Sequence, residues 1–404
     1  MSKPTLHLLG LPHTVTTEAF SHCAFTGKVL RFAPMLRQVG YQVVHYGVEG
    51  AESGANEQVD VLATGQWEDL KRKTRAAKNL PEPTEKTYIG DLADSGSILY
   101  RVFNQILYHH LRDRVRPGDI ICLPFGHAHQ MATNELRADK DAPLVELVET
   151  GIGYPHTFCR HLVFETAAWM HWHLGKRPEN IRGSVDDYCW VAPNYFDASA
   201  WDFSATPEKD LVVFFGRLNS GKGLDVVRDV ADRRPDLRFI LCGQGDPTPW
   251  LGPKNVEYLA PLAGRARSDL LGRAMCVLMP TRFVEPFGGV TIEANLCGSP
   301  VLGSACGSFT ETILEGETGY RCNTLGDFLA ALELVEDGKI DRAACRRHGE
   351  KYDTSKVGPR YDMIFRQVSD LFGDGWYAMR SRHGEVRRAI APVQVEQDNE
   401  KAAQ

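Results

Sequence analysis

The sequence predicts an α/β protein made of two Rossmann-like, doubly wound parallel-sheet domains. Three observations support this fold class. Short apolar runs alternate with segments of helical periodicity along the chain. At 404 residues the chain is too long for one ordinary hydrophobic core. A polar stretch without periodicity, DASAWDFSATPEKD, divides the alternation into two series.

The two series set the expected domain boundaries. We expect one domain in residues 1–195, a linker in 196–210 and a second domain in 211–355. Residues 356–374 are expected to form a C-terminal helix that could cross back to the first domain. The charged residues 375–404 are expected to form a polar tail that stays disordered at its end.

In the first domain, the apolar run at 5–11 predicts the opening strand. Helical spacing at 28–40 predicts a helix that ends at Gly40, and the next strand is expected at 41–47. This order favours parallel strands joined by a right-handed crossover. Further along, we expect helices at 97–115 and 163–175 and strands at 119–126, 144–149 and 186–197.

The second domain repeats the alternation with short apolar strands. The expected strands are 210–218, 237–245, 255–260, 275–280 and 300–304, with helices at 222–234, 268–274, 290–298 and on to about residue 371. The loops that follow such strands share the carboxyl edge of a parallel sheet, where open α/β proteins bind ligands.

Composition argues against several classes of protein. The formal charge is 46 minus 52, or −6, so the chain has no overall attraction for nucleic acid or anionic lipid. No apolar run is long enough to span a bilayer, and the N-terminus lacks a signal peptide's long apolar region. The ten cysteines are scattered, which fits buried thiols in a reducing cytoplasm. We therefore expect a cytoplasmic protein.

Two local charge patterns have both a functional and a plainer interpretation. The Asp-x-Asp at Asp139–Asp141 could hold a metal, but it lies in a polar turn where surface charge is commoner. The segment 71–78 could contact a membrane surface or a nucleic-acid backbone, although a solvated loop is the commoner case. Its basic residues are Lys71, Arg72, Lys73, Arg75 and Lys78.

The segment FFGRLNSGKG follows a predicted strand and precedes a predicted helix. Gly216 permits close approach of a ligand to the backbone, and Arg217 and Lys222 add cations suited to a diphosphate. The alternative is a turn with solvated basic residues. CGQG, with Gly243 and Gly245, is weak by itself, but it would lie on the same sheet edge.

The segment EPFGGVTIE separates two carboxylates by a proline and two glycines. This break predicts Glu285 on a loop and Glu293 about one turn into the next helix, so the two do not share one helix face. The amides of Gly288, Gly289 and Val290 would lie between them. A ligand with phosphates in the middle and hydroxyl-rich groups at both ends would suit this site. A nucleotide sugar has this composition.

Taken in order, FFGRLNSGKG, EPFGGVTIEANLCGSPVLGS and GSFTETILEGETGY resemble the donor-binding half of family 4 glycosyltransferases. Their GT-B fold implies that the two domains face a central cleft. The resemblance covers roughly residues 205–350. It implies that Glu285 contacts the transferred sugar and Glu293 holds the ribose. It also implies that Arg217 and Lys222 bind the diphosphate as catalytic groups. The remaining implied donor contacts are Gly27, Gly216, Gly243, Gly245, Pro286, Phe287, Gly288, Gly289 and Val290.

The same resemblance makes the first domain the acceptor side. Many relatives place a histidine at the end of an inner strand of that domain. In this sequence the candidates near that point are Glu149, Thr150 and His156, while Trp169 and Trp172 could stack on an acceptor.

The resemblance implies a hexosyltransferase that retains anomeric configuration and needs no metal or cofactor. UDP-glucose is the default donor. The acceptor stays open among a glycan, a lipid, a small metabolite and a modified DNA base such as a hydroxymethylpyrimidine, as does the oligomeric state. Two alternatives remain: an NAD-dependent oxidoreductase, for which GxGxxG after the first strand is missing, and a non-catalytic nucleotide-sugar-binding protein.

Overall fold

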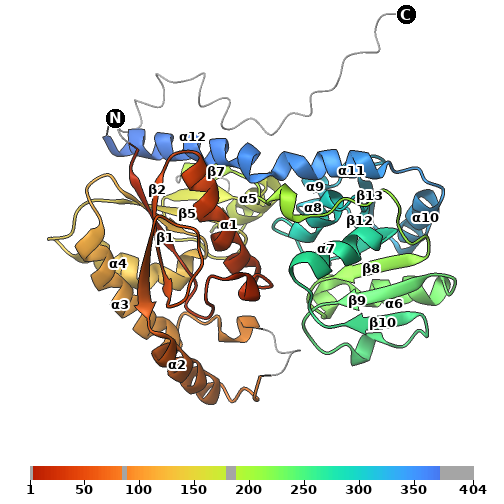
Figure 1. Cartoon of the computed structure of the whole chain (residues 1–404), viewed down its shortest axis with the longest axis horizontal. Helices are drawn as coiled ribbons and strands as arrows, with labels where there is room; N and C mark the ends of the chain where they lie inside the picture. The colour runs from red at the N-terminus through yellow and green to blue at the C-terminus, as the bar shows by residue number, and fades with distance from the viewer. Residues whose placement is uncertain (1–2, 84–88, 179–187, 374–404) are drawn as a thin grey trace, which may run out of the picture.

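The computed structural model describes residues 3–83, 89–178 and 188–373, so the expected tail at 375–404 lies outside the described residues. Two fully parallel sheets form two halves that lie side by side (Figure 1). Each sheet has hydrophobic clusters on both faces, as expected where helices cover both sides of a parallel sheet. The predicted fold class is confirmed.

The N-terminal sheet has the strand order β3-β2-β1-β4-β5-β6-β7. Its strands are β1 (Thr5–Leu9), β2 (Gln42–Val48), β3 (Glu57–Leu62), β4 (Ile120–Leu123), β5 (Glu146–Ile152), β6 (His161–Phe164) and β7 (Tyr188–Val191). The connecting helices are α1 (Ala24–Gln38), α2 (Thr64–Ala77), α3 (Ile98–Arg114), α4 (Gln130–Ala138) and α5 (Ala167–Gly175). The order reverses at β1, where a doubly wound sheet opens its ligand crevice.

The C-terminal sheet has the order β10-β9-β8-β11-β12-β13 and also reverses at its first strand. Its strands are β8 (Leu211–Phe215), β9 (Arg238–Cys242), β10 (Val256–Leu259), β11 (Cys276–Met279), β12 (Val301–Ser304) and β13 (Gly319–Cys322). Its helices are α6 (Leu224–Arg233), α7 (Gly264–Arg273), α8 (Gly289–Leu296), α9 (Phe309–Thr312), α10 (Leu325–Glu336) and α11 (Arg342–Gly349). The last helix, α12 (Thr354–Gly373), follows α11.

Helix α12 leaves the C-terminal half and packs on the N-terminal half (Figure 1). It lies against α1, and its apolar residues belong to the same buried cluster as Phe32 and Met35 of that helix. These residues are Val357, Tyr361, Ile364, Phe365 and Val368. The chain therefore crosses between the halves twice, once before β8 and once before α12.

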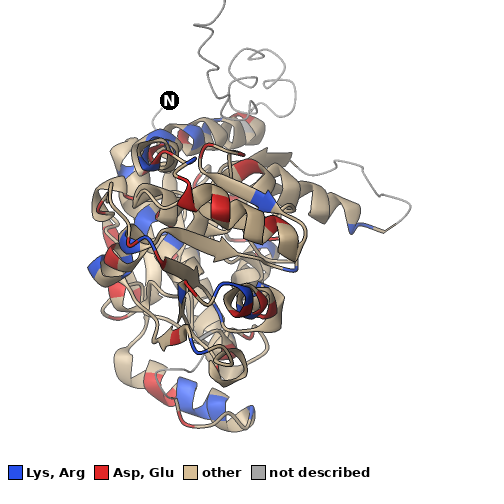
Figure 2. Cartoon of the chain, turned by 90° about the vertical axis from the view of Figure 1, so that its right-hand side faces the viewer, with Lys and Arg blue, Asp and Glu red and all other residues tan. Residues whose placement is uncertain are grey.

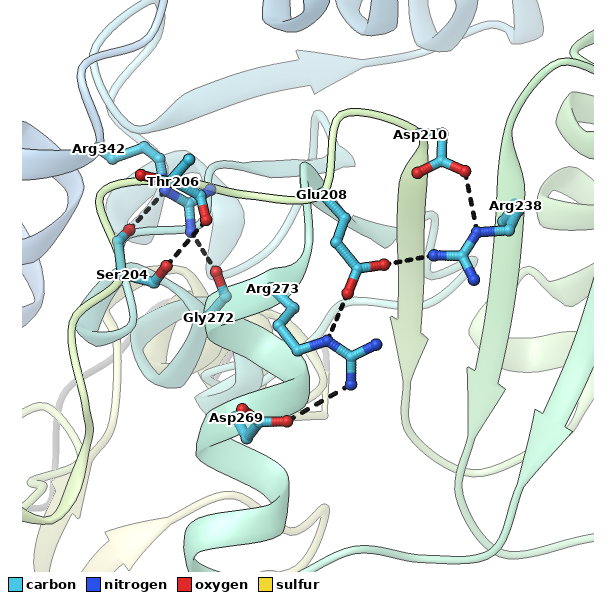
Figure 3. Close-up of polar contacts among 9 residues, drawn as sticks. All are labelled: Ser204, Thr206, Glu208, Asp210, Arg238, Asp269, Gly272, Arg273 and Arg342. Carbon is cyan, nitrogen blue, oxygen red and sulfur yellow. Dashed lines mark hydrogen bonds and ion pairs between the residues drawn. The ribbon is translucent and has the colours of Figure 1, made fainter.

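The crossing before β8 is fixed to the C-terminal half by arginines (Figure 3). Arg342 donates to the carbonyl oxygen of Ser204 at 2.7 Å and to that of Gly272 at 2.7 Å. Glu208 accepts from Arg273 at 2.5 Å and also pairs with Arg238. The polar composition that indicates a linker in the sequence thus serves here to attach the segment to one half.

Several expected elements differ from the structure. The strands β3, β6 and β13 were not predicted. Residues 163–164 end strand β6, and the helix begins only at Ala167, because the Thr166 side chain caps it by accepting from the Trp169 amide at 3.1 Å. Residues 71–77 of the basic segment lie on helix α2 and not in a loop, and Lys78 is the C-cap residue of that helix.

Charge and thiols complete the description. Figure 2 shows basic and acidic residues interspersed along the ribbon. All ten cysteines are free thiols. Over the part of the chain that the structure describes, no helix combines the length and apolar character needed to cross a membrane.

Candidate active site

A cleft of about 520 Å³ lies between the two halves and is lined by both. Its C-terminal wall comes from the segments after β8, β9, β10 and β11, from α7 and from the start of α8. Its N-terminal wall comes mainly from the segments after β1, β4, β5, β6 and β7 and from the starts of α1 and α5. The carboxyl edges of both sheets therefore face one space, which is where this architecture places ligands.

The loops after β8 and β9 touch each other through glycines. A Cβ atom on Gly243 would lie 1.7 Å from the carbonyl oxygen of Gly216, so no other residue fits without moving the loop. The Gly216 amide donates to the Cys242 carbonyl at 3.0 Å, and Leu218 donates to Gln244 at 2.7 Å. The glycine segments after β8 and β9 therefore form one continuous surface at the cleft, where a ligand can approach the backbone closely.

Lys222 and Glu285 meet on this wall although 63 residues separate them. Asn219 fixes the turn that carries Lys222, because its side-chain oxygen accepts from the Lys222 amide at 3.0 Å. The Lys222 ammonium contacts the Glu285 carboxylate, with side-chain exposures of 13% and 11%. The pair is thus poorly hydrated yet open to the cleft, where its charges act strongly on a ligand.

The residues after Glu285 form the start of α8. Gly288 is the N-cap residue with φ +69°, a conformation that glycine adopts without strain. Phe287 is buried and packs with Phe196 at a ring-centroid distance of 6.3 Å, which anchors the loop. Gly288, Gly289 and Val290 line the cleft, so the helix start faces the space where an anion would be favoured.

Glu293 has a partner that sequence reasoning missed. Arg267 of α7 contacts the Glu293 carboxylate, and its guanidinium lies 4.5 Å from the centre of the Phe215 ring. Both charged residues line the cleft. The sequence signal was weak, because Arg267 is a single basic residue directly before the helix predicted at 268–274 and such residues are common on any surface.

The N-terminal wall carries a second ion pair that the sequence did not predict. Lys28 of α1 contacts Glu165 at the end of β6, and its ammonium also donates to the Gly151 carbonyl at 2.7 Å. Both side chains are 4% exposed and line the cleft. Burial raises the pKa of Glu165, while Lys28 and Asn194 oppose this shift and the Glu285 carboxylate adds to it. Glu165 and Glu285 thus lie on opposite walls of the same cleft.

Not all predicted donor contacts line this cleft. Of those on the C-terminal wall, only Gly245 does not belong to the lining; a Cβ there would lie 2.9 Å from the Leu218 carbonyl oxygen. Gly27 lies inside the first turn of α1 and not on a glycine-rich loop. The lining in that region consists of its neighbours Ala24, Phe25 and Lys28.

The acceptor-side candidates also lie elsewhere. The buried Glu149 carboxylate accepts from the amides of Phe158 and Cys159 at 2.7 and 2.8 Å and from the Tyr154 hydroxyl at 2.8 Å. It thus holds the loop after β5 and does not line the cleft. Thr150 is buried and His156 is exposed, and neither belongs to the lining. Trp169 does line the cleft, with Trp172 stacked on it at 4.2 Å.

The two charge patterns are engaged in local contacts. Asp139 accepts from the Tyr108 hydroxyl at 2.8 Å and from Arg112 at 2.6 Å. On the basic segment, Lys71 pairs with Glu68, Arg72 and Lys73 with Asp69, Lys78 with Asp94, and Arg75 donates to the Pro81 carbonyl. Within the described residues, no cluster of three or more His, Cys, Asp or Glu side chains could hold a metal ion.

The charges of the lining give the cleft a positive balance. Five cations and three carboxylates line it, so the sum is +2 with histidines neutral: Lys28, Arg31, Arg217, Lys222 and Arg267 against Glu165, Glu285 and Glu293. Burial lowers the pKa of His13 to about 4, so this lining histidine is uncharged at neutral pH. A site with this balance favours a ligand with about two negative charges.

The two walls are joined directly by the start of α5. Thr166 donates its hydroxyl to the Pro286 carbonyl at 2.8 Å. Glu311 of α9 accepts from the amides of Ala167 and Ala168 at 3.1 and 2.8 Å. These contacts cap a helix of one half with a carboxylate of the other, which the helix dipole favours. They also tie the residue after Glu165 to the residue after Glu285.

We expect Glu311→Ala to lower the free energy of opening the first turn of α5 by about 1 kcal/mol, the usual cost of losing a helix cap. The amides of the first turn of α5 should then exchange with deuterium about five times faster. Hydrogen exchange with mass spectrometry of a peptide covering 166–170 measures this. Glu317→Ala, on the following exposed turn, is the matched control. Unchanged exchange in Glu311→Ala would show that the cap does not hold α5.

Two Rossmann-like domains that face a charged cleft define the class of this protein: it has the GT-B fold. Residues 197–352 match the family model described as Glycosyl transferases group 1, which confirms the resemblance for the C-terminal domain. D-inositol 3-phosphate glycosyltransferase from Mycobacterium sp. (strain KMS) is 30% identical over 125 residues, which make up 28% of this chain and 28% of that protein. The match thus spans little more than a quarter of that relative.

Solved structures share the fold over nearly the whole chain. Sucrose-phosphate synthase from Thermosynechococcus elongatus aligns with a TM-score of 0.63 and 13% identity, covering 91% of this chain and 99% of that one. Anabaena HepE in complex with UDP-glucose aligns with a TM-score of 0.59 and 16% identity, covering 91% and 100%. At these identities the likeness concerns the fold alone.

Proposed function

We propose that the protein is a glycosyltransferase that moves a hexose from a nucleoside diphosphate sugar to an acceptor hydroxyl with retention of configuration. The observation that carries this proposal is the C-terminal wall, where Lys222–Glu285 and Arg267–Glu293 flank the start of α8. The positive balance of the cleft matches a diphosphate. The C-terminal family match supports this donor class. UDP-glucose, which HepE binds, is the first candidate donor.

The proposed roles are those that the resemblance to family 4 glycosyltransferases implies, and the positions of these residues on the cleft wall support them. Arg217, Lys222 and the amides at the start of α8 face the diphosphate, and Glu285 contacts the transferred sugar. Glu293, held by Arg267, binds the ribose hydroxyls. These groups stabilise the negative charge that builds on the departing diphosphate.

The reaction is proposed as a front-face displacement. The bond between the anomeric carbon and the diphosphate oxygen breaks while the acceptor oxygen attacks from the same face. The acceptor proton passes to the departing diphosphate oxygen, so atoms and charge balance without a protein nucleophile. No metal ion or cofactor enters this scheme.

Titration calorimetry with UDP, ADP, GDP and NAD⁺ tests the donor class. We expect one nucleoside diphosphate to bind at least ten times more tightly than NAD⁺, since a sugar ring is proposed to occupy the space beyond the diphosphate, where NAD⁺ carries a nicotinamide riboside. Preferred binding of NAD⁺ with a nicotinamide absorbance change on turnover would support the oxidoreductase instead. Binding of a nucleotide sugar without release or transfer of its sugar would indicate a non-catalytic binding protein.

A further inference from the structure

The N-terminal wall of the cleft contains a buried ion pair with no role in the donor site. Lys28 and Glu165 are each 4% exposed, and both line the cleft. The free-energy cost of removing two charges from water can exceed the attraction between them. A buried ion pair is therefore weak evidence that the pair stabilises the fold. A buried, perturbed carboxylate in a cleft is a candidate for a functional group.

The chain around Glu165 is shaped to hold its carboxylate. Gly153 lies against it, since a Cβ there would be 3.0 Å from one carboxylate oxygen. Gly151, with φ +69°, turns its carbonyl to Lys28 at 2.7 Å. Gly151, near the end of strand β5, and Gly153, directly after that strand, therefore both border this pair. Gly153 leaves room for the carboxylate where a side chain would crowd it.

The same wall offers aromatic rings. Phe25, Phe125 and Trp169 line the cleft, and the centres of Phe25 and Phe125 are 4.5 Å apart. The Lys28 ammonium lies 4.4 Å from the centre of the Phe25 ring. Aromatic faces with one carboxylate suit a ligand that has an apolar face and several hydroxyl groups. A hydroxylated ring, such as a sugar or a cyclitol, has this chemistry.

The position of Glu165 relative to the donor wall is fixed. The next residue, Thr166, donates to the carbonyl of Pro286, which directly follows Glu285. The amides of Ala167 and Ala168 are held by Glu311. Two carboxylates from different halves are thereby kept on opposite sides of one space, and a sugar ring bound between them would meet both.

We propose that Glu165 is an acceptor-contact residue that accepts a hydrogen bond from the reacting hydroxyl of a sugar or cyclitol ring bound against Phe25, Phe125 and Trp169. This inference rests on the proposed function. Glu165 orients the hydroxyl, and Lys28 keeps the carboxylate in place. The proton still leaves with the diphosphate, so Glu165 takes part without being protonated.

Saturation-transfer NMR of the full chain loaded with UDP tests this proposal. The probes are methyl α-glucoside, methyl α-mannoside and myo-inositol. We expect at least one of them to bind, and Glu165→Gln to weaken that binding about tenfold while the affinity for UDP stays within threefold. Glu135→Gln, an exposed carboxylate on α4, is the matched control. A double variant, Lys28→Met with Glu165→Gln, removes both charges and guards against misfolding of the single variant.

The outcomes separate the two proposals. If none of the three probes binds the UDP-loaded protein, or if Glu165→Gln binds as well as wild type, the assignment of Glu165 is overturned. If wild-type protein binds none of the nucleoside diphosphates, the proposed function itself fails. Loss of probe binding in both the single and the double variant, with UDP binding retained, supports the assignment.

Discussion

Lys222→Ala is expected to lower sugar release from the nucleotide-sugar donor by at least about a hundredfold. Removing one preorganised group that stabilises developing charge typically costs about 3 kcal/mol of barrier. Lys222 fits this role because it lines the cleft, is 13% exposed and already holds a carboxylate. Release of UDP from UDP-glucose, measured with and without an added acceptor, gives the rate.

Two companion variants sharpen this test. Glu285→Ala should also reduce turnover severely, because it removes the other half of the pair and the proposed sugar contact. Lys254→Ala, an exposed lysine on the loop before β10, should leave the rate unchanged. Thermal unfolding of each variant checks that the fold survives. Near-normal rates in both Lys222→Ala and Glu285→Ala would remove the basis of the proposed active site.

Gly223→Ala is expected to destabilise the C-terminal domain by about 3 kcal/mol and to disturb the loop that carries Lys222. Gly223 has φ +75°, and a Cβ atom there would lie 1.9 Å from the carbonyl oxygen of Pro280. Strained backbone alone costs about 1 kcal/mol or more, and this contact is with backbone that cannot swing away. A lower midpoint of urea unfolding and weaker UDP binding are the expected results.

Substitutions at two other glycines distinguish the cost of backbone strain from the cost of the close contact with Pro280. Gly50 has φ +84° but open space around its Cβ position, so Gly50→Ala tests the backbone strain alone at about 1 kcal/mol. Gly65, in helix α2, has open space and no positive φ, so Gly65→Ala should be neutral or slightly stabilising. If Gly223→Ala costs no more than Gly50→Ala, the close contact with Pro280 is not maintained in solution.

The sequence predicted most of the fold because its signals are local. Strands such as β8 and β9 are continuous apolar runs, and α3 and α6 have helical periodicity with clear ends. The strands that were missed give weaker patterns. Strand β13 has four residues, of which two are only half-buried, and β3 lies at the edge of its sheet. Strand β6 runs almost directly into α5, so the two were merged into one predicted helix.

The residues of the candidate site also fall into those that local sequence signals predict and those that they do not. Some site residues could be predicted because they belong to strand-loop-helix segments, and local glycine and proline residues mark where each strand and helix ends. These residues are Lys222, Glu285, Gly288 and Glu293. The helix predicted at 28–40 leaves Gly27 in the segment before it, whereas α1 begins four residues earlier, at Ala24, and contains Gly27. Glu149 was named for its position at a strand end, but its side chain points into the loop that it holds.

The sequence by itself determined that two parallel-sheet domains exist and that one of them presents glycine loops, two cations and a divided pair of glutamates. Only the tertiary structure decided which charges meet. Arg267 and Glu293 are 26 residues apart, and Lys28 and Glu165 are 137 apart. No periodicity or motif encodes such pairs. They arise when the sheet edges bring distant loops together, and burial then makes each charge depend on its partner.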